Sequence, residues 1–133
     1  MITSLELEPL RGDGDRVRFS TIRGQRVLIS DFSGITESAV LRREVEKAKR
    51  ILADEPEDSV LVLVDISGVP YSLENVQILK DAALYNRRFV RARAVLGVPE
   101  IARFSFRAVG QASGRKLESF ETVDEALDWL LEQ

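Results

Sequence analysis

The sequence predicts an α/β fold: a single domain, residues 1–133, with a mixed, mainly parallel sheet of about five strands and about four covering helices. Three observations lead to this prediction. The chain has 133 residues, 44% of them apolar, which suits one hydrophobic core. Apolar runs typical of strands alternate with amphipathic stretches typical of helices. Near the N-terminus a glycine-centred break separates two β-type runs, which adds an antiparallel hairpin at the edge of the sheet.

The N-terminal hairpin is predicted from residues 16–22 and 26–32, which flank Arg23, Gly24 and Gln25. Upstream of it, Leu5 and Leu7 alternate with two glutamates, a pattern that permits a short additional strand. Residues 11–15, with two glycines and two aspartates, are typical of a turn.

The first predicted helix covers residues 36–53, because apolar side chains recur there at helical spacing, at Leu41, Val45, Ala48 and Leu52. It ends before Pro56, since proline lacks a backbone donor and restricts the residue before it. Residues 60–66 are apolar without alternation, as in a strand that is covered on both faces. We therefore expect the central strand of the sheet there.

The second half of the chain continues the alternation. Ser72 is expected to cap a helix that extends through Arg87, and residues 92–98 have the composition of the next strand. A helix over residues 100–112 follows, entered at Pro99. Its predicted apolar face, flanked by Phe104 and Phe106, comprises Ile101, Ser105, Ala108, Val109 and Ala112.

The C-terminal elements are a short strand and a helix. Gly114 is expected to end the preceding helix, and residues 117–120 to form the last strand. Thr122 and Glu125 have the spacing of a capping box, in front of a helix whose apolar face comprises Ala126, Leu127, Leu130 and Leu131. Right-handed crossovers between successive strands then make the sheet mainly parallel.

The composition excludes several function classes. The chain has no Cys and no His, which removes disulfides, thiol nucleophiles, imidazole bases and zinc sites built on those ligands. Its net charge of −3, from 19 basic and 22 acidic residues, fits neither a polybasic nucleic-acid binder nor a disordered acidic tail. The remaining carboxylates, hydroxyls and amines specify no reaction. We therefore expect a protein that is not an enzyme and that uses no cofactor and no metal.

The location of the protein is predicted from its apolar segments. Glu6 and Glu8 interrupt the N-terminus where a signal peptide needs an apolar stretch. The longest purely aliphatic run, residues 60–64, is far shorter than the roughly 20 residues that cross a bilayer. We expect a cytoplasmic protein without a membrane span.

A short motif occurs twice, as Asp31-Phe-Ser-Gly-Ile35 and as Asp65-Ile-Ser-Gly-Val69. Each copy follows an apolar strand and precedes a helix, and short polar side chains with glycine are typical of such turns. The alternative is that Asp31 and Asp65 meet at the carboxyl edge of the sheet and hold Mg²⁺ for phosphate chemistry. The chain has no phosphate-binding GxxxxGK[ST] loop and no GxGxxG turn, which argues against that alternative.

Positive charge is concentrated in residues 87–116. Eight basic residues stand there against Glu100 alone, a local net charge of +7 in a chain of net charge −3. Arg103 and Arg107 are expected to share one side of their helix, and Arg91 and Arg93 one side of a strand. The segment is either a set of solvated faces or a surface for an anionic partner, such as an acidic protein or an anionic lipid. Nucleic acid is disfavoured because the aromatic residues form no stacking platform.

Trp129 lies off the apolar stripe of the last helix. Either another element of the same chain covers it, or it belongs to a surface that binds a protein partner or a second copy of the chain.

Four stretches resemble the SpoIIAA-like proteins of the STAS superfamily: Leu63-Val-Asp-Ile-Ser-Gly-Val69, Asn86-Arg-Arg-Phe-Val-Arg91, Ala94-Val-Leu-Gly97 and Phe120-Glu-Thr-Val-Asp-Glu-Ala-Leu-Asp-Trp-Leu130. The resemblance covers the second half of the chain. It implies a compact α/β domain with a mixed sheet, in agreement with the pattern of elements.

The resemblance also implies two kinds of function. Similar domains act as antagonists of anti-sigma factors and change partner when a serine at the start of the helix after the central strand is phosphorylated. In this chain Glu74 or Asn75 stands at the usual acceptor position, and Ser72 is the remaining candidate acceptor. The related fold of the CRAL-TRIO lipid carriers holds an apolar ligand.

We therefore expect a noncatalytic interaction or regulatory module of the STAS type, whose partner contacts comprise Ser72, Glu74, Asn75, Arg103, Arg107 and Trp129. The alternative is a binder of a small apolar molecule or lipid, in a cavity between sheet and helices lined by Leu79, Phe104 and Phe106.

Overall fold

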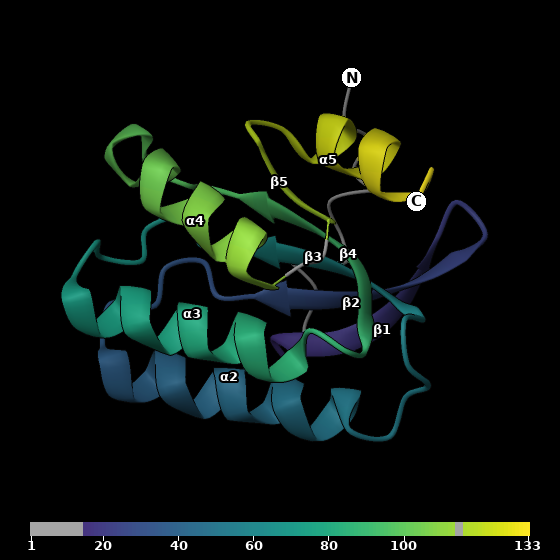
Figure 1. Ribbon diagram of the computed structural model, residues 1–133, viewed down its shortest axis with the longest axis horizontal. Coiled ribbons are helices and arrows are strands. Elements are labelled where there is room, and N and C mark those ends of the chain that lie inside the picture. Colours follow the sequence, from purple (N-terminus) through teal and green to yellow (C-terminus); the bar gives the residue numbers. More distant parts are fainter. Residues whose placement is uncertain (1–14, 114–115) are drawn as a thin grey trace.

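A computed structural model describes residues 15–113 and 116–133 and confirms the α/β fold (Figure 1). The five strands of its sheet lie in the order of the sequence, with β1 antiparallel to β2 and the other neighbours parallel. They are β1 (Val17–Ile22), β2 (Gln25–Asp31), β3 (Val60–Asp65), β4 (Val90–Leu96) and β5 (Lys116–Phe120). The strand expected around Leu5 and Leu7, most of the turn in residues 11–15 and the helix end at Gly114 lie outside the described residues.

Helices cover both faces of this sheet. They are α2 (Ser38–Leu52), α3 (Leu73–Asn86), the 3₁₀ turn η1 (Glu100–Ala102) with α4 (Arg103–Ser113), and α5 (Val123–Leu130). Because β2 to β5 are parallel neighbours in sequence order, right-handed crossovers place α2, α3 and α4 on the same face. The chain then passes to the opposite face, where α5 packs (Figure 1). No helix of the described part of the chain is both long and apolar enough to span a bilayer.

The predicted caps are present. Ser72 is the N-cap of α3, and its hydroxyl accepts a hydrogen bond from the Asn75 backbone at 3.1 Å. Thr122 caps α5 in the same way through the Glu125 backbone at 3.2 Å. The Thr122 hydroxyl also donates to the Glu125 carboxylate at 3.0 Å, so these two side chains bond each other directly.

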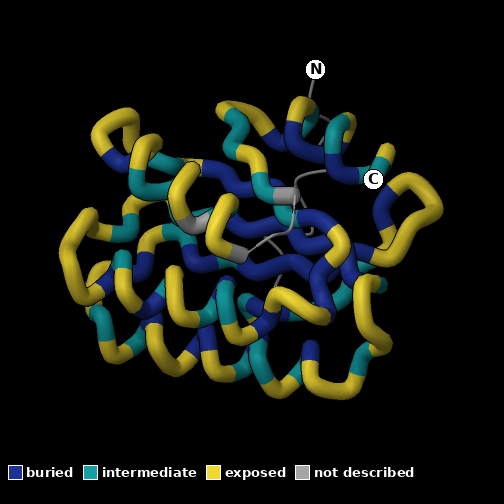
Figure 2. Tube along the Cα trace, in the orientation of Figure 1, coloured by how far each residue is buried: buried dark blue, intermediate teal, exposed yellow. Residues whose placement is uncertain are grey.

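The central strand β3 separates two hydrophobic cores, as its uninterrupted apolar sequence predicts. Val62 and Val64 face the three-helix side, whereas Leu61 and Leu63 face α5. The strands form the buried interior of the molecule, and the helices expose their outer sides (Figure 2).

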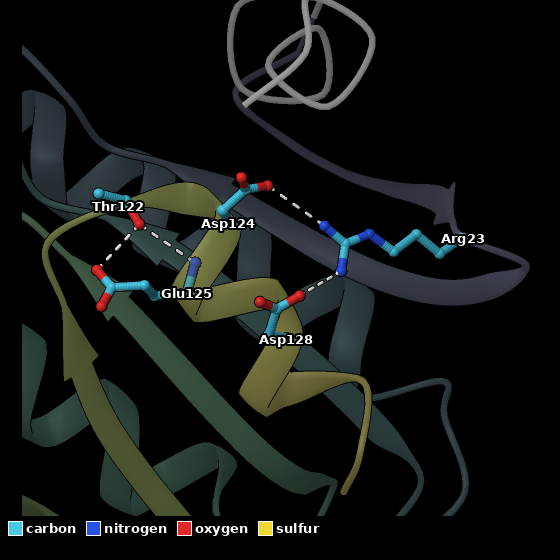
Figure 3. A network of polar contacts seen from close by, with 5 residues as sticks. All are labelled: Arg23, Thr122, Asp124, Glu125 and Asp128. Carbon is cyan, nitrogen blue, oxygen red and sulfur yellow. Dashed lines mark hydrogen bonds and ion pairs between the residues drawn. The ribbon is translucent and has the colours of Figure 1, made fainter. Parts of the chain in front are cut away.

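A polar network connects the N-terminal hairpin to the C-terminal helix (Figure 3). Arg23, in the turn between β1 and β2, adopts a positive φ of 50°. Its guanidinium reaches Asp128 at 2.7 Å and Asp124 at 3.3 Å, both on α5. The contact connects the turn of the hairpin to the helix that covers its face of the sheet.

The apolar face predicted for residues 100–112 is wrong at most of its described positions, although Ser105 is partly buried. Ile101 is 76% exposed, and Ala108 and Ala112 are exposed as well. Ala102 is buried instead, and Phe106 packs against the core. The segment begins with a 3₁₀ turn, whose residues advance by about 120° rather than 100° each, so a single helical period cannot describe both parts.

Candidate functional site

A cavity of about 140 Å³ lies between the three-helix face of the sheet and the helices that cover it, and it is partly open to solvent. Its sheet side is formed by β2, β3, β4 and β5, through residues such as Leu28, Val62, Val95 and Leu117. The helical side and the rim come from α2, α3, α4 and the loops that precede α3 and η1, through Val45, Val69, Leu79, Val98 and Phe106. Apolar side chains dominate the lining.

Small side chains on the helices leave this space open. Ala48 on α2, Ala82 and Ala83 on α3 and Ala102 at the end of η1 all line it. Protein interiors normally pack without voids larger than a water molecule, because lost contacts destabilise the fold. A longer apolar side chain at any of these four positions would occupy part of the cavity.

Arg93 lies on the floor of the cavity. It occupies the middle of β4, in register with Val62 of β3 and Leu117 of β5, which also line the cavity. Among the described residues, no oxygen forms a hydrogen bond or an ion pair with its guanidinium. Burial lowers the pKa of Arg93 to about 10, so the side chain remains a cation at neutral pH.

The charged side chains that line the cavity are both positive. Arg93 and Lys80 are its charged residues, and no Asp or Glu of the described chain lines the cavity. Asn86, at the end of α3, is a second polar group in the lining without a full set of partners. It is 3% exposed, and its Oδ1 has no hydrogen-bond partner. The site is thus an apolar space with a cation and an unsatisfied amide on its walls.

Two side-chain contacts shape the rim of the cavity. The hydroxyls of Tyr71, before α3, and Ser105, on α4, lie 3.3 Å apart. Asn75 donates to the Pro70 carbonyl at 2.8 Å and accepts from the Ser38 hydroxyl at 2.7 Å. Asn75 is 3% exposed, so its placement among partner-binding residues is corrected: both ends of its amide connect elements of the fold.

The three residues predicted to line a cavity divide into two groups. Leu79 and Phe106 line it, at the positions that helical spacing predicted. Phe104 is 86% exposed and lies outside the lining, so this part of the prediction is wrong. Phe104 lies three residues after Ile101, which is exposed as well.

The predicted partner-binding residues do not form one cluster. Ser72 is exposed and acts as the N-cap, and Glu74 is exposed with its carboxylate 3.8 Å from Arg42. Arg103 is an exposed residue of α4 whose guanidinium lies 3.6 Å from Glu121, and Arg107 is exposed on the same helix.

The basic segment is divided among separate environments. Arg88 lies over the Phe89 ring, and Arg91 donates to the Asp58 carbonyl at 3.2 Å. The register of β3 and β4 shifts between Val60 and Leu61, so Arg91 has no partner position on β3. Arg91 is exposed, whereas Arg93 lines the cavity. The two arginines therefore lie in different environments, and Arg115 lies outside the described residues.

Asp31 and Asp65 are register neighbours on β2 and β3, as the repeated motif suggested. The Asp31 carboxylate accepts from the backbone and hydroxyl of Ser33 at 3.1 and 2.5 Å. The Asp65 carboxylate accepts from the Ser67 backbone at 2.9 Å. Both carboxylates therefore stabilise the turns that follow their strands. No group of three possible metal ligands occurs in the described ranges.

Trp129 is partly buried on α5, and its ring lies 5.5 Å from that of Phe120, between centroids. Its observed aromatic contact is thus within the chain.

The comparisons with known proteins identify the fold. No protein-family model and no curated protein matches the chain. A solved structure does: the crystal structure of an uncharacterised protein of the DUF3478 family with a SpoIIAA-like fold, from Shewanella loihica PV-4. The similarity covers 86% of this chain and 91% of that chain, with a TM-score of 0.63 and 17% identity. The chain has a SpoIIAA-like fold, as the four sequence stretches implied.

Proposed function

We propose that this protein binds a small, predominantly apolar molecule in the cavity between the sheet and α2, α3 and α4, without catalysing a reaction. The observation that carries the proposal is the cavity of about 140 Å³, which is lined mainly by apolar side chains and partly open to solvent. An apolar pocket with a few convergent polar groups is the usual form of a small-molecule site.

The volume sets the size of the ligand. A cavity of about 150 Å³ that is lined by aliphatic side chains stays dry and binds benzene. The cavity of this protein is of the same size, so a ring or a short branched hydrocarbon group fits inside it. The volume is too small to enclose a membrane lipid, since sites for drug-sized ligands have about 300–1,000 Å³.

The test uses toluene as the probe and a matched pair of substitutions. Ala82→Leu places a larger side chain in the cavity, whereas Ala108→Leu makes the same change on an exposed site of α4. NMR titration with toluene should shift the amide signals of Val62, Arg93 and Val95 in the wild type. It should do so equally in A108L and much less in A82L. Native mass spectrometry of the purified protein should also detect a retained small molecule.

A wild-type protein that shows no saturable toluene shifts and carries no small molecule would overturn this function. Equal shifts in A82L and the wild type would overturn the assignment of the site.

A protein-interaction or regulatory module is the second candidate, and it is supported by exposed apolar side chains near the rim. Leu73 is 92% exposed, Ile101 76% and Phe104 86%. The contact between Tyr71 and Ser105 joins the two segments that carry them. Because monomeric proteins rarely expose large contiguous apolar patches, such a group favours association. Sedimentation equilibrium of the wild type and of the double variant L73S/F104S tests self-association: a dimer that the variant loses supports it, and a wild-type monomer contradicts it.

A further inference from the structure

The polar groups of the cavity define the chemistry of its ligand more narrowly than its shape does. This step rests on the proposed function. An apolar cavity that served only hydrocarbons would gain nothing from a guanidinium on its floor, because a cation without a partner is unfavourable in a low-dielectric site. Arg93 nevertheless lines the cavity, without a hydrogen bond or an ion pair to any described residue.

We propose that the ligand is a small carboxylic acid, whose hydrocarbon part fills the apolar cavity and whose carboxylate pairs with the guanidinium of Arg93. The volume of about 140 Å³ limits the hydrocarbon part to about the size of a benzene ring. Aromatic and short-chain carboxylates have this combination of one charge and one compact apolar group.

The charged residues that line the cavity determine the sign of the charge that its ligand carries. Arg93 and Lys80 are both cations, and no carboxylate of the described residues faces the cavity to neutralise them. A cationic ligand would be repelled, and a neutral one would leave Arg93 unpaired. An anionic ligand would form an ion pair with Arg93, whose guanidinium is partly desolvated by burial.

A carboxylate fits this position better than a phosphate does. The planar guanidinium offers paired N–H donors that match two carboxylate oxygens in a bidentate arrangement. One buried cation balances one charge, whereas a phosphate monoester carries close to two charges at neutral pH and would bury the second without a partner. Lys80 is exposed, so water already solvates its charge.

The backbone fixes the location of Arg93. Its Cα is paired with Val62 on one side and with Leu117 on the other, so β4 holds it within a five-stranded sheet. Residues on such a rigid element lose little freedom when a ligand binds, which favours affinity. Asn86, whose Oδ1 has no hydrogen-bond partner, adds a second polar group on the α3 side of the same space.

Calorimetric titration with benzoate and with benzyl alcohol at neutral pH tests the proposal, because the two probes share a ring and differ in charge. The wild type should bind benzoate about tenfold more tightly or better, as expected for a charged hydrogen-bonded pair. Arg93→Met keeps a long side chain and removes the charge, so it should abolish this preference. Arg93→Lys keeps the positive charge but lacks the paired N–H donors of the guanidinium. It should therefore retain part of the preference for benzoate. Arg107→Met, an exposed arginine on α4, is the matched control and should leave the preference intact.

The outcomes separate this proposal from the proposed function. If benzyl alcohol and toluene bind but benzoate binds no better, or if R93M keeps the preference for benzoate, the carboxylate site is wrong and the apolar site stands. If neither toluene nor benzyl alcohol binds, the proposed function itself fails. A preference that disappears in R107M but persists in R93M would assign the anion to the surface of α4 and overturn the assignment to Arg93. Tighter binding of phenyl phosphate than of benzoate would overturn the choice of a carboxylate.

The pH dependence supplies an independent measurement. Burial lowers the pKa of Arg93 only to about 10, so the guanidinium is protonated throughout the acidic and neutral range. Lys80 and Tyr71 are the other titratable groups of the lining. Benzoate affinity should therefore be constant near neutrality and should fall below about pH 4, where the ligand carboxylate is protonated. A decrease between pH 6 and pH 8 would contradict the Arg93 carboxylate pair.

Discussion

Under the proposed function, Arg93 serves binding at the expense of stability. It is flanked on β4 by Ala92 and Ala94, which are fully buried on the opposite face. On its own face the neighbouring strands contribute Val62 and Leu117 to the same cavity. An apolar residue would fit these surroundings better, because its burial requires no partner. The structure thus places an unfavourable group where a ligand can satisfy it, a trade between stability and function that is common at binding sites.

Arg93→Met should stabilise the protein in the absence of ligand. Replacing a partly desolvated cation by an apolar side chain of similar length should raise the free energy of unfolding by about 1 kcal/mol. For a domain of this size the melting temperature should rise by about 4 °C, measured by calorimetry. Benzoate at high concentration should reverse the order, since it binds the wild type more tightly and therefore stabilises it more.

The difference in unfolding free energy between the wild type and R93M depends on pH. Burial lowers the pKa of Arg93 to about 10, below its value in the unfolded chain, so the unfolded chain binds the proton more tightly. As the pH rises through 10, the wild type therefore gains stability relative to R93M, whereas the difference is constant below that range. Urea unfolding of both proteins at pH 8 to 10.5 measures this. A destabilised R93M at neutral pH would show that Arg93 contributes to folding.

Asn75→Ala should destabilise the fold more than the loss of the neighbouring cap does. The Asn75 amide connects Ser38 of α2 to the Pro70 carbonyl, and it is 3% exposed. Removing two buried hydrogen bonds should lower the free energy of unfolding by about 2 kcal/mol. Ser72→Ala removes only the cap on the Asn75 backbone and should cost about 1 kcal/mol. Urea unfolding of both variants compares them, and equal losses would contradict the structural role of the Asn75 side chain.

At the scale of elements, the sequence predicts most of the fold because hydrophobic spacing and caps are local signals. The apolar run of β3, the cap of α3 at Ser72 and the cap of α5 at Thr122 all occur as predicted. The burial of α4 was not predictable in the same way. The 3₁₀ turn before it changes the angular spacing, so Phe106 lines the cavity as expected, whereas Phe104 is exposed.

The cavity was predicted only in part, for a related reason. Leu79 and Phe106 were identified because they lie on helices that had to cover the sheet. The sequence placed Arg93 in a basic segment, read either as solvated faces or as a surface for an anionic partner, because local charge density does not show which arginine faces inward. The register shift between β3 and β4 breaks the alternation that would relate Arg91 to Arg93. The available signal was a pair of arginines, Arg91 and Arg93, within an otherwise small and apolar strand.

The loops that precede α3 and η1 depend on a close approach at Gly97. This residue has a φ of 83°, and a Cβ placed there would lie 2.5 Å from the Ser67 backbone nitrogen. Gly97→Ala should therefore lower the free energy of unfolding by about 3 kcal/mol, from left-handed strain and from the clash with backbone that cannot move freely.

Gly24→Ala is the matched control for Gly97→Ala. Gly24 has a similar φ of 81°, but a Cβ there would meet no atom within 4 Å. It should lose only about 1–2 kcal/mol from backbone strain. Equal melting temperatures of the two variants would show that the approach between Gly97 and Ser67 relaxes without cost.

The helices on the two faces of the sheet differ in how closely they pack against it. On one face the single helix α5 packs closely, with Ala126, Leu127 and Leu130 fully buried, and Arg23 connects the hairpin to it (Figure 3). On the other face three helices must cover the sheet together, and the alanines on them leave the cavity open. The first face provides a rigid support for β4, and the second provides the space above Arg93.

The size of that space predicts how affinity depends on ligand length. For straight-chain carboxylates from butanoate upward, each methylene that enters the cavity should add about 0.8 kcal/mol, or about fourfold in affinity. The increase should stop when the hydrocarbon part reaches about six carbons, because a volume of about 140 Å³ is then filled and further methylenes remain in water. Calorimetric titration of the series measures the chain length at which the increase in affinity stops, and this length should be shorter in A82L. Affinity that rises at the same rate through decanoate would show that the helices separate to admit a longer chain, and the fixed volume would then not determine the ligand.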